Sequence, residues 1–143
     1  MARFESEAFG MSEELMALIN HALRECLDRA ATGNSVMPTV YYSLNGTTCT
    51  VVRGSEQSPE EISRLGWGLE KRKPPYFVLV IEGHLTTEAE PRTPALFAQG
   101  FEQDRADGVQ FAQRYRRATK GIPFAPMGNL SFLGRIPRYS SPA

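Results

Sequence analysis

An unbroken apolar run, YFVLVI at residues 76–81, is the feature that most limits how this chain can fold. It is far too short to cross a bilayer, which takes roughly 20 apolar residues in a helix. It shows neither the polar alternation of a half-exposed strand nor the length of a helix. The run therefore predicts the central strand of a sheet, buried on both faces.

Two amphipathic helices are predicted before this strand. Ser12 is a good N-cap, and an apolar stripe with three-four spacing follows it, which predicts a helix over residues 13–32. Ser58-Pro59 opens the second helix, with Glu61 placed to complete a capping box. That helix must end before Pro74-Pro75.

Between the helices, VYYSLNGTTCTVV predicts a β-hairpin. Asn45-Gly46 suits a two-residue turn, because both central positions of that turn need positive φ. Such a turn places Tyr42 opposite Cys49 and Val40 opposite Val51. Cys49 would then lie on the apolar side of the hairpin, and we expect a buried free thiol there.

After the central strand, residues 95–102 and 109–116 read as two further strands joined by a polar connection. Residues 119–143 mix prolines and glycines with large apolar side chains, so we expect an irregular segment packed on the body. Residues 1–10 are expected to be flexible.

The order of elements predicts one α+β domain over residues 1–143, with a mainly antiparallel sheet of about five strands and both helices on one face. This order of elements resembles that of roadblock and profilin-like domains, a likeness of topology that implies no function.

Charge is balanced overall but unevenly distributed. The chain has 16 basic and 16 acidic residues, yet residues 108–143 contain six basic residues and no acidic one. Arg114, Arg116 and Arg117 are candidates for binding an anionic partner. Strand alternation separates Tyr115 from Arg114 and Arg116, so stacking and charge would not share a surface, and nucleic acid is not the expected partner.

Glu82 and His84 follow the apolar run and are the candidate catalytic pair. If the strand continues through Gly83, both side chains point to the same face, where a carboxylate and an imidazole can exchange a proton. The alternative is that Gly83 ends the buried strand and that both side chains are polar because the chain reaches water there. We favour this second interpretation, because polar strand ends are far commoner than catalytic pairs. The first would make the chain a small enzyme or a ligand-binding domain with this pair at a pocket rim.

Motifs for cofactors and metals are absent from the sequence. It contains no phosphate-binding glycine loop, no nucleophile elbow and no His or Cys spacing typical of zinc, so no cofactor and no metal are expected. The N-terminal residues lack the apolar core of a signal peptide, and we expect a cytoplasmic protein without a membrane partner.

Apolar residues outside the predicted core point to another class of function. Trp67 lies off the buried stripe of its helix, and Phe124, Phe132 and Leu133 fall in the irregular C-terminal segment. Apolar and aromatic side chains beside a basic rim are typical of protein interfaces. The sequence therefore favours a non-catalytic, self-associating domain, expected to be a homodimer.

Overall fold

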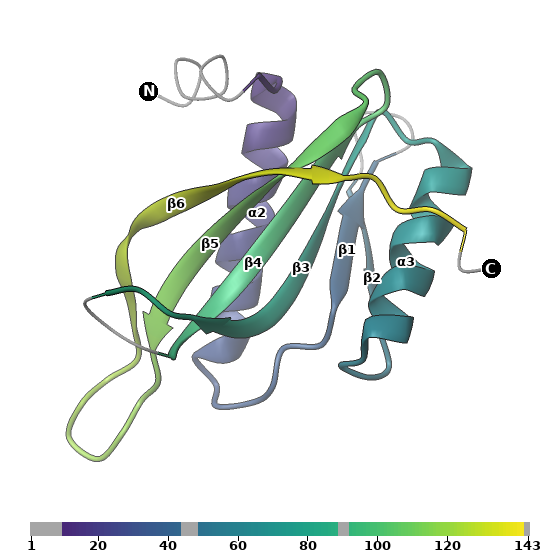
Figure 1. Ribbon diagram of the computed structural model, residues 1–143. Coiled ribbons are helices and arrows are strands. Elements are labelled where there is room, and N and C mark those ends of the chain that lie inside the picture. The colour runs from purple at the N-terminus through teal and green to yellow at the C-terminus, as the bar shows by residue number, and fades with distance from the viewer. Residues whose placement is uncertain (1–9, 44–48, 89–91, 142–143) are drawn as a thin grey trace.

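The computed structural model describes residues 10–43, 49–88 and 92–141. Its elements in chain order are α2 (Glu13–Ala30), β1 (Thr39–Tyr42), β2 (Thr50–Arg53), α3 (Pro59–Arg72), β3 (Tyr76–Leu85), β4 (Thr93–Glu102), β5 (Asp107–Arg116) and β6 (Ala125–Pro137). The strands form one antiparallel sheet in the order β2-β1-β3-β4-β5-β6 (Figure 1). The chain is thus an α+β fold, with six strands in the described ranges where about five were predicted.

Both helices begin where the sequence predicts. Ser12 Oγ accepts the Leu15 N–H at 3.1 Å, and Ser58 Oγ accepts the Glu61 N–H, also at 3.1 Å. The last turn of α3 ends at Lys73, whose φ of 53° is left-handed, directly before Pro74. Neither described helix is long and apolar enough to span a membrane.

The helices lie on opposite faces of the sheet, so the prediction that both share one face is wrong. α2 packs against one face through residues that include Val78 and Val80, whereas α3 packs against the alternate residues Phe77 and Leu79. In Figure 1, α2 lies behind the sheet and α3 stands at its right side. The physical reason is the apolar run itself: with both helices on one face, Phe77 and Leu79 would remain in water.

The β1–β2 pairing differs by one residue from the prediction. Val40 pairs with Val52 and Tyr42 with Thr50, where a two-residue turn at Asn45-Gly46 would pair them with Val51 and Cys49; Asn45-Gly46 itself lies outside the described residues. The sequence pattern could not set this register, because β1 is buried on both faces and tolerates either alignment. Cys49, expected to be buried, is exposed.

The segment predicted to be irregular contains β6, which pairs with β5 along the edge of the sheet. Its register shifts twice, and Gly128 (φ 68°) and Gly134 (φ 123°) lie within this interrupted stretch. Bulges break the alternation of apolar and polar residues, and an edge strand accepts prolines that a central strand would exclude. These two effects hid the strand from the sequence pattern.

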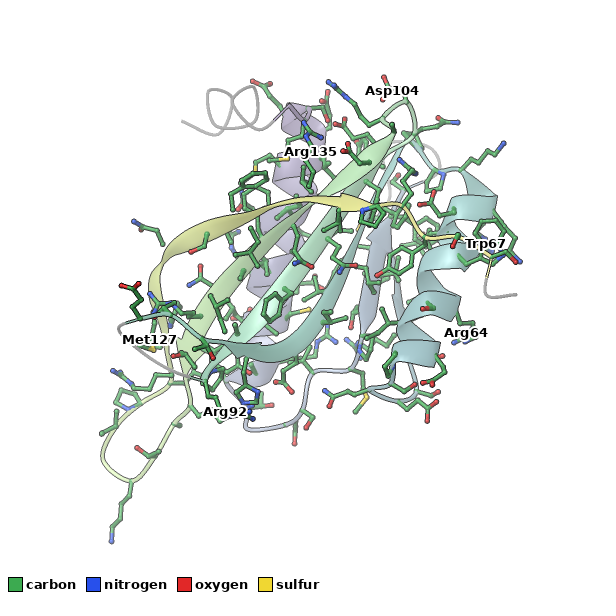
Figure 2. The ribbon with its side chains drawn as sticks, in the orientation of Figure 1. Arg64, Trp67, Arg92, Asp104, Met127 and Arg135 are labelled. Carbon is green, nitrogen blue, oxygen red and sulfur yellow. The ribbon has the colours of Figure 1, made fainter. Side chains whose placement is uncertain are left out.

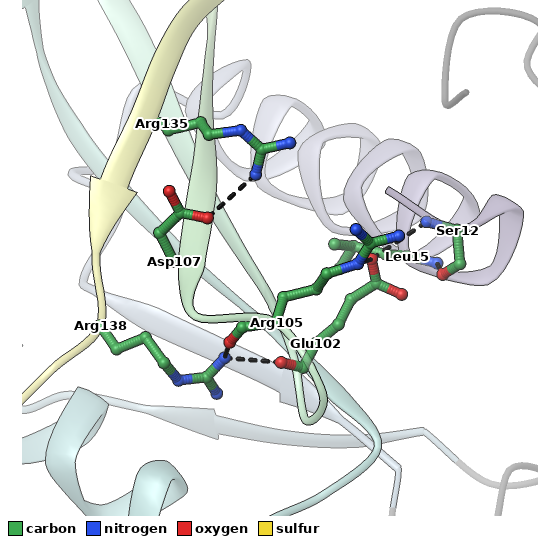
Figure 3. A network of polar contacts seen from close by, with 7 residues as sticks. All are labelled: Ser12, Leu15, Glu102, Arg105, Asp107, Arg135 and Arg138. Carbon is green, nitrogen blue, oxygen red and sulfur yellow. Dashed lines mark hydrogen bonds and ion pairs between the residues drawn. The ribbon is translucent and has the colours of Figure 1, made fainter. Parts of the chain in front are cut away.

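After β6, the chain crosses to α3. The Tyr139 ring lies against Gly66, where an added Cβ would overlap it, and Tyr139 also contacts Phe101 with ring centroids 5.7 Å apart. Arg138 pairs with Glu70 at 2.8 Å and donates to the carbonyl oxygens of Glu102 and Arg105 (Figure 3). Gly66 therefore serves the docking of Tyr139.

Glu61 is buried in the first turn of α3 and makes a different contact from the one the capping box predicts. Its carboxylate accepts the Ser55 N–H at 2.7 Å and pairs with Arg64 at 2.6 Å. The pKa of Glu61 is lowered to about 2, mainly by the hydrogen bond from Arg64 and next by the one from the Ser55 backbone N–H. The ionised carboxylate thus ties the loop after β2 to the start of α3.

Glu61→Gln should remove part of the acid sensitivity of this fold. Because the folded-state pKa is lowered from 4.5, the carboxylate stabilises the protein fully above about pH 4.5 and loses this effect as the pH falls toward 2. Chemical unfolding between pH 2 and pH 7 should give a shallower acid slope for Glu61→Gln than for wild type. Arg64→Ala should raise the Glu61 pKa in an NMR titration, and identical slopes and titrations would contradict this account.

Gly108→Ala should destabilise the fold by about 1–3 kcal/mol, as overpacking of a core does. The added Cβ would overlap the Phe101 ring and lie 2.8 Å from the Gly100 carbonyl oxygen, and backbone cannot move aside cheaply. Denaturant unfolding measures the loss. Gly68→Ala is the matched control: it meets no atom within 4 Å inside α3 and should stabilise by about 0.5–1 kcal/mol.

Candidate functional site

Glu82 and His84 lie in a continuous strand, because β3 extends through Gly83 to Leu85. Gly83 pairs with Ala95 in an unbroken register, so the two side chains do point to one face of the sheet, the face covered by α2. Their surroundings differ sharply. The Glu82 side chain is only 9% exposed, whereas His84 is exposed.

The carboxylate of Glu82 is held by three other residues. It accepts the Tyr115 hydroxyl at 2.8 Å and the Gln57 amide at 3.3 Å, and Arg117 approaches it to 3.7 Å. Burial is the main cause that raises the pKa of Tyr115, and the hydrogen bond to Glu82 raises it further. The phenol therefore stays protonated and donates. Glu82 thus links β3 to β5 and to the loop before α3.

No proton-transfer couple forms between Glu82 and His84 among the described residues, where neither a hydrogen bond nor an ion pair joins them. In the same ranges, no group of three His, Cys, Asp or Glu side chains could hold a metal. The pair also does not line the groove described below. The geometry gives this cluster a cross-linking role between strands.

Cys26 is fully buried on the side of α2 that packs against the sheet. Its thiol lies 3.4 Å from the Tyr41 hydroxyl, and Arg29 donates to the same hydroxyl at 2.9 Å. Burial raises the pKa of Cys26, so the thiol stays protonated and is a poor nucleophile.

The basic candidates divide between the two faces, as strand alternation predicts. Arg117 lies on the α2 side, with its guanidinium 5.4 Å from the centre of the Tyr115 ring. Arg116 is exposed and donates to the Pro123 carbonyl oxygen at 3.2 Å, and Arg114 lies beside Gly128 across the β5–β6 pair. Arg114 and Arg116 therefore share a face from which Arg117 is absent.

The candidate interface residues do not form one patch. Trp67 lies on the side of α3 turned away from the sheet (Figure 2), whereas Phe124 packs against Tyr115 beside α2, with ring centroids 5.4 Å apart. Phe132 and Leu133 belong to β6 and are 37% and 41% exposed. Phe132 contacts Phe111, on the α2 side of the sheet.

A groove of about 530 Å³ runs between α2 and β6 and takes in one of these residues, Phe124. Its lining combines apolar and polar side chains: Leu23, Leu27, Ala31, Phe124, Pro126 and Leu130 on one hand, and Asn20, Arg24, Asp28 and Gln113 on the other. The α2 side was missed because Leu23 and Leu27 read as part of the core stripe, and the polar residues beside them read as an ordinary helix surface. We call this feature the α2–β6 groove.

Gln113 fixes one wall of the α2–β6 groove. Its side-chain amide donates to the Arg114 carbonyl at 2.9 Å and to the Met127 carbonyl at 3.3 Å, at the point where the β5–β6 register shifts. A bulge leaves carbonyl groups without ladder partners, and this amide satisfies them. These contacts of the Gln113 amide shape the wall, and no local sequence motif predicts them.

Comparisons with protein-family models, with curated proteins and with solved structures found no match to this chain.

Tyr115→Phe should lower the free energy of unfolding by about 1–2 kcal/mol, because it removes a hydrogen bond to a buried carboxylate. Arg117→Ala, which breaks a longer and more exposed contact, should cost no more than about 1 kcal/mol. Denaturant titration ranks the variants. Tyr76→Phe is the matched control on β3 and should stay within about 0.5 kcal/mol of wild type; equal effects of all three variants would contradict the assignment.

Proposed function

We propose that this chain is a non-catalytic protein-interaction domain that self-associates as a homodimer through the α2–β6 groove. The groove joins half-buried apolar side chains, Leu27, Phe124 and Leu130, to an exposed polar border. An apolar centre inside a polar border is the usual composition of a protein interface. This proposal uses the C-terminal residues singled out from the sequence and leaves Trp67 outside the interface.

The observation that carries the proposal is the charge pattern of α2 along the groove. Arg24 and Asp28 are exposed and one helical turn apart, and neither forms an ion pair with another described residue. When two copies of α2 pack antiparallel about a two-fold axis, Arg24 of each copy faces Asp28 of the other. The surface is thus complementary to itself, which is what a symmetric dimer requires.

Exposed apolar side chains extend this surface along β6. Ile122 is 47% exposed, and it precedes β6, which carries Phe132 and Leu133. A second copy seated on α2 would reach Phe132, which contacts Phe111 on the α2 side of the sheet, and remove part of its ring from water. Each 100 Å² of apolar surface buried contributes roughly 2.5 kcal/mol before the cost of association.

A second function, binding of a small ligand, is favoured by the size of the groove. The groove volume of about 530 Å³ falls in the range of roughly 300–1,000 Å³ that small-molecule sites occupy. Glu82 and His84 do not line it, so this ligand site would not use the pair expected from the sequence. A monomer that binds small apolar molecules in this groove would favour this second function.

Charge reversal tests the dimer. Light scattering coupled to size-exclusion chromatography should show wild type as a dimer at micromolar concentration. Arg24→Asp and Asp28→Arg should each weaken dimerisation at least tenfold, about 1.4 kcal/mol, because each places like charges opposite each other twice. The double variant, Arg24→Asp with Asp28→Arg, should restore the dimer.

Lys71→Asp is the control for Arg24→Asp, since it makes the same change in net charge on α3, at the other face of the sheet. It should leave dimerisation unchanged, and thermal melts should show all variants folded. A monomeric wild type, or a double variant no better than the single ones, would overturn the proposal.

A further inference from the structure

Residues 138–141 cross from the end of β6 to α3 without forming a helix or a strand (Figure 1), and we call them the strap. The strap lies in a cleft that has α3 as one wall and the end of β4 as the other, because its side chains contact residues of both elements. Arg138 and Tyr139 fill the middle of this cleft. We call it the α3–β4 cleft.

The arginine of the strap is held by acceptors on three sides. Its guanidinium donates to Glu70 through Nε at 3.0 Å and lies 2.8 Å from it through Nη2. Nη1 donates to the carbonyl oxygens of Glu102 and Arg105 (Figure 3). The Glu70 side chain is only 10% exposed, and its carboxylate also accepts the Tyr139 N–H at 3.2 Å. This set of acceptors suits the planar, branched donors of arginine and not the single ammonium of lysine.

The tyrosine of the strap is held separately from the arginine. The Tyr139 ring lies against Gly66 and contacts Phe101, and its hydroxyl donates to Gln99 Oε1. A Cβ at Gly66 would overlap the ring, so the close approach depends on glycine. Phe101 also lies beneath the Arg138 guanidinium, 5.6 Å from the centre of its ring. The α3–β4 cleft therefore recognises an arginine followed by an aromatic residue.

The strap leaves space in the cleft on both of its sides. Toward the C-terminal end of α3 lies a hollow of about 350 Å³, whose lining includes the exposed side chains Lys73 and Arg105. Toward the first half of α3 lies a hollow of about 400 Å³, beside Ser63 and Gln99. Arg138 lines both hollows, so the strap separates them. A longer segment that runs along α3 would fill both, and an acidic residue in it would face Lys73 and Arg105.

We propose that the α3–β4 cleft binds an extended segment of a partner protein, with an arginine and a following aromatic residue at its centre and an acidic residue toward Lys73. The strap occupies the cleft until this partner displaces it. The partner fills the two hollows that the strap leaves empty, which supplies the difference in affinity that displacement requires. Because the strap competes, the affinity of wild type is reduced by the fraction of molecules whose cleft is open. The site is separate from the α2–β6 groove, since α2 and α3 cover opposite faces of the sheet.

Opening the cleft by mutation tests whether the strap is a competitor. The double variant, Arg138→Ala with Tyr139→Ala, removes the competing side chains and keeps the residues that hold them. A fluorescein-labelled peptide with the sequence of residues 136–141, IPRYSS, is titrated by fluorescence anisotropy. It should bind the double variant at least about tenfold more tightly than wild type. In wild type labelled with nitrogen-15, saturating unlabelled peptide should move the Tyr139 N–H resonance toward its position in an unfolded chain, a result that does not depend on the stability of any variant.

Two glycines of α3 provide a matched pair of variants in the double-variant background. Gly66→Ala meets no tyrosine of its own chain there, yet it should weaken peptide binding at least about tenfold, because the peptide's tyrosine overlaps the new methyl group. Gly68→Ala meets no atom within 4 Å and should leave binding unchanged. Glu70→Gln should weaken binding at least about tenfold by removing the charge that pairs with arginine, whereas Glu60→Gln, exposed at the start of α3, should not. Thermal melts check that each variant is folded.

Selection from a phage-displayed random peptide library, panned against the double variant, identifies the chemistry of the partner. Enriched peptides should carry arginine followed by an aromatic residue, with Asp or Glu nearby, and should bind more tightly than IPRYSS. Lys73→Glu should weaken these peptides and leave IPRYSS unaffected. The proposal is overturned if IPRYSS does not bind the double variant, if the two glycine variants behave alike, or if the enriched peptides lack the arginine–aromatic pair. Enriched peptides no tighter than IPRYSS would assign the cleft to the strap of a second copy and would also overturn it.

Discussion

Burial of β3 on both faces is the constraint on which the rest of this structure depends. Phe77 and Leu79 need cover on one side, and Val78 and Val80 need it on the other, so one helix must serve each face. Two helices can cover only part of a six-stranded sheet. The groove beside α2 and the half-buried position of Phe97 on the other face both follow from this shortage of cover.

The two edges of the sheet are managed in different ways. β6 is long, but its register shifts and left-handed glycines interrupt the row of backbone groups that another chain could pair with. β2 is short, and all four of its residues are exposed. Both devices limit pairing along the edges, which leaves the sheet faces as the better surfaces for specific contacts.

Local rules predicted what depends on neighbouring residues. The caps at Ser12 and Ser58 and the strands of the β3–β5 meander are set within a few residues, and all were found near the predicted positions. The register of β2 and the strand character of residues 125–137 depend on partners that local pattern cannot identify.

The same limit applies to the candidate site. Strand alternation placed Glu82 and His84 on one face, but the hydrogen bond from Tyr115 to Glu82 joins residues 33 apart, and no local sequence pattern predicts it. Arg24 and Asp28 can be read from the sequence, but their position beside a groove depends on β6, which forms the other wall.

Glu102, at the end of β4, has a consequence for the order of folding. Its carboxylate accepts the Ser12 N–H, 90 residues away, and its carbonyl oxygen accepts Arg138, 36 residues away (Figure 3). Contacts of such long sequence separation repay their loop-closure entropy only after the intervening chain is arranged, so they form late. We therefore expect the corner around Glu102 to be completed late during folding, because both contacts need the intervening chain in place first.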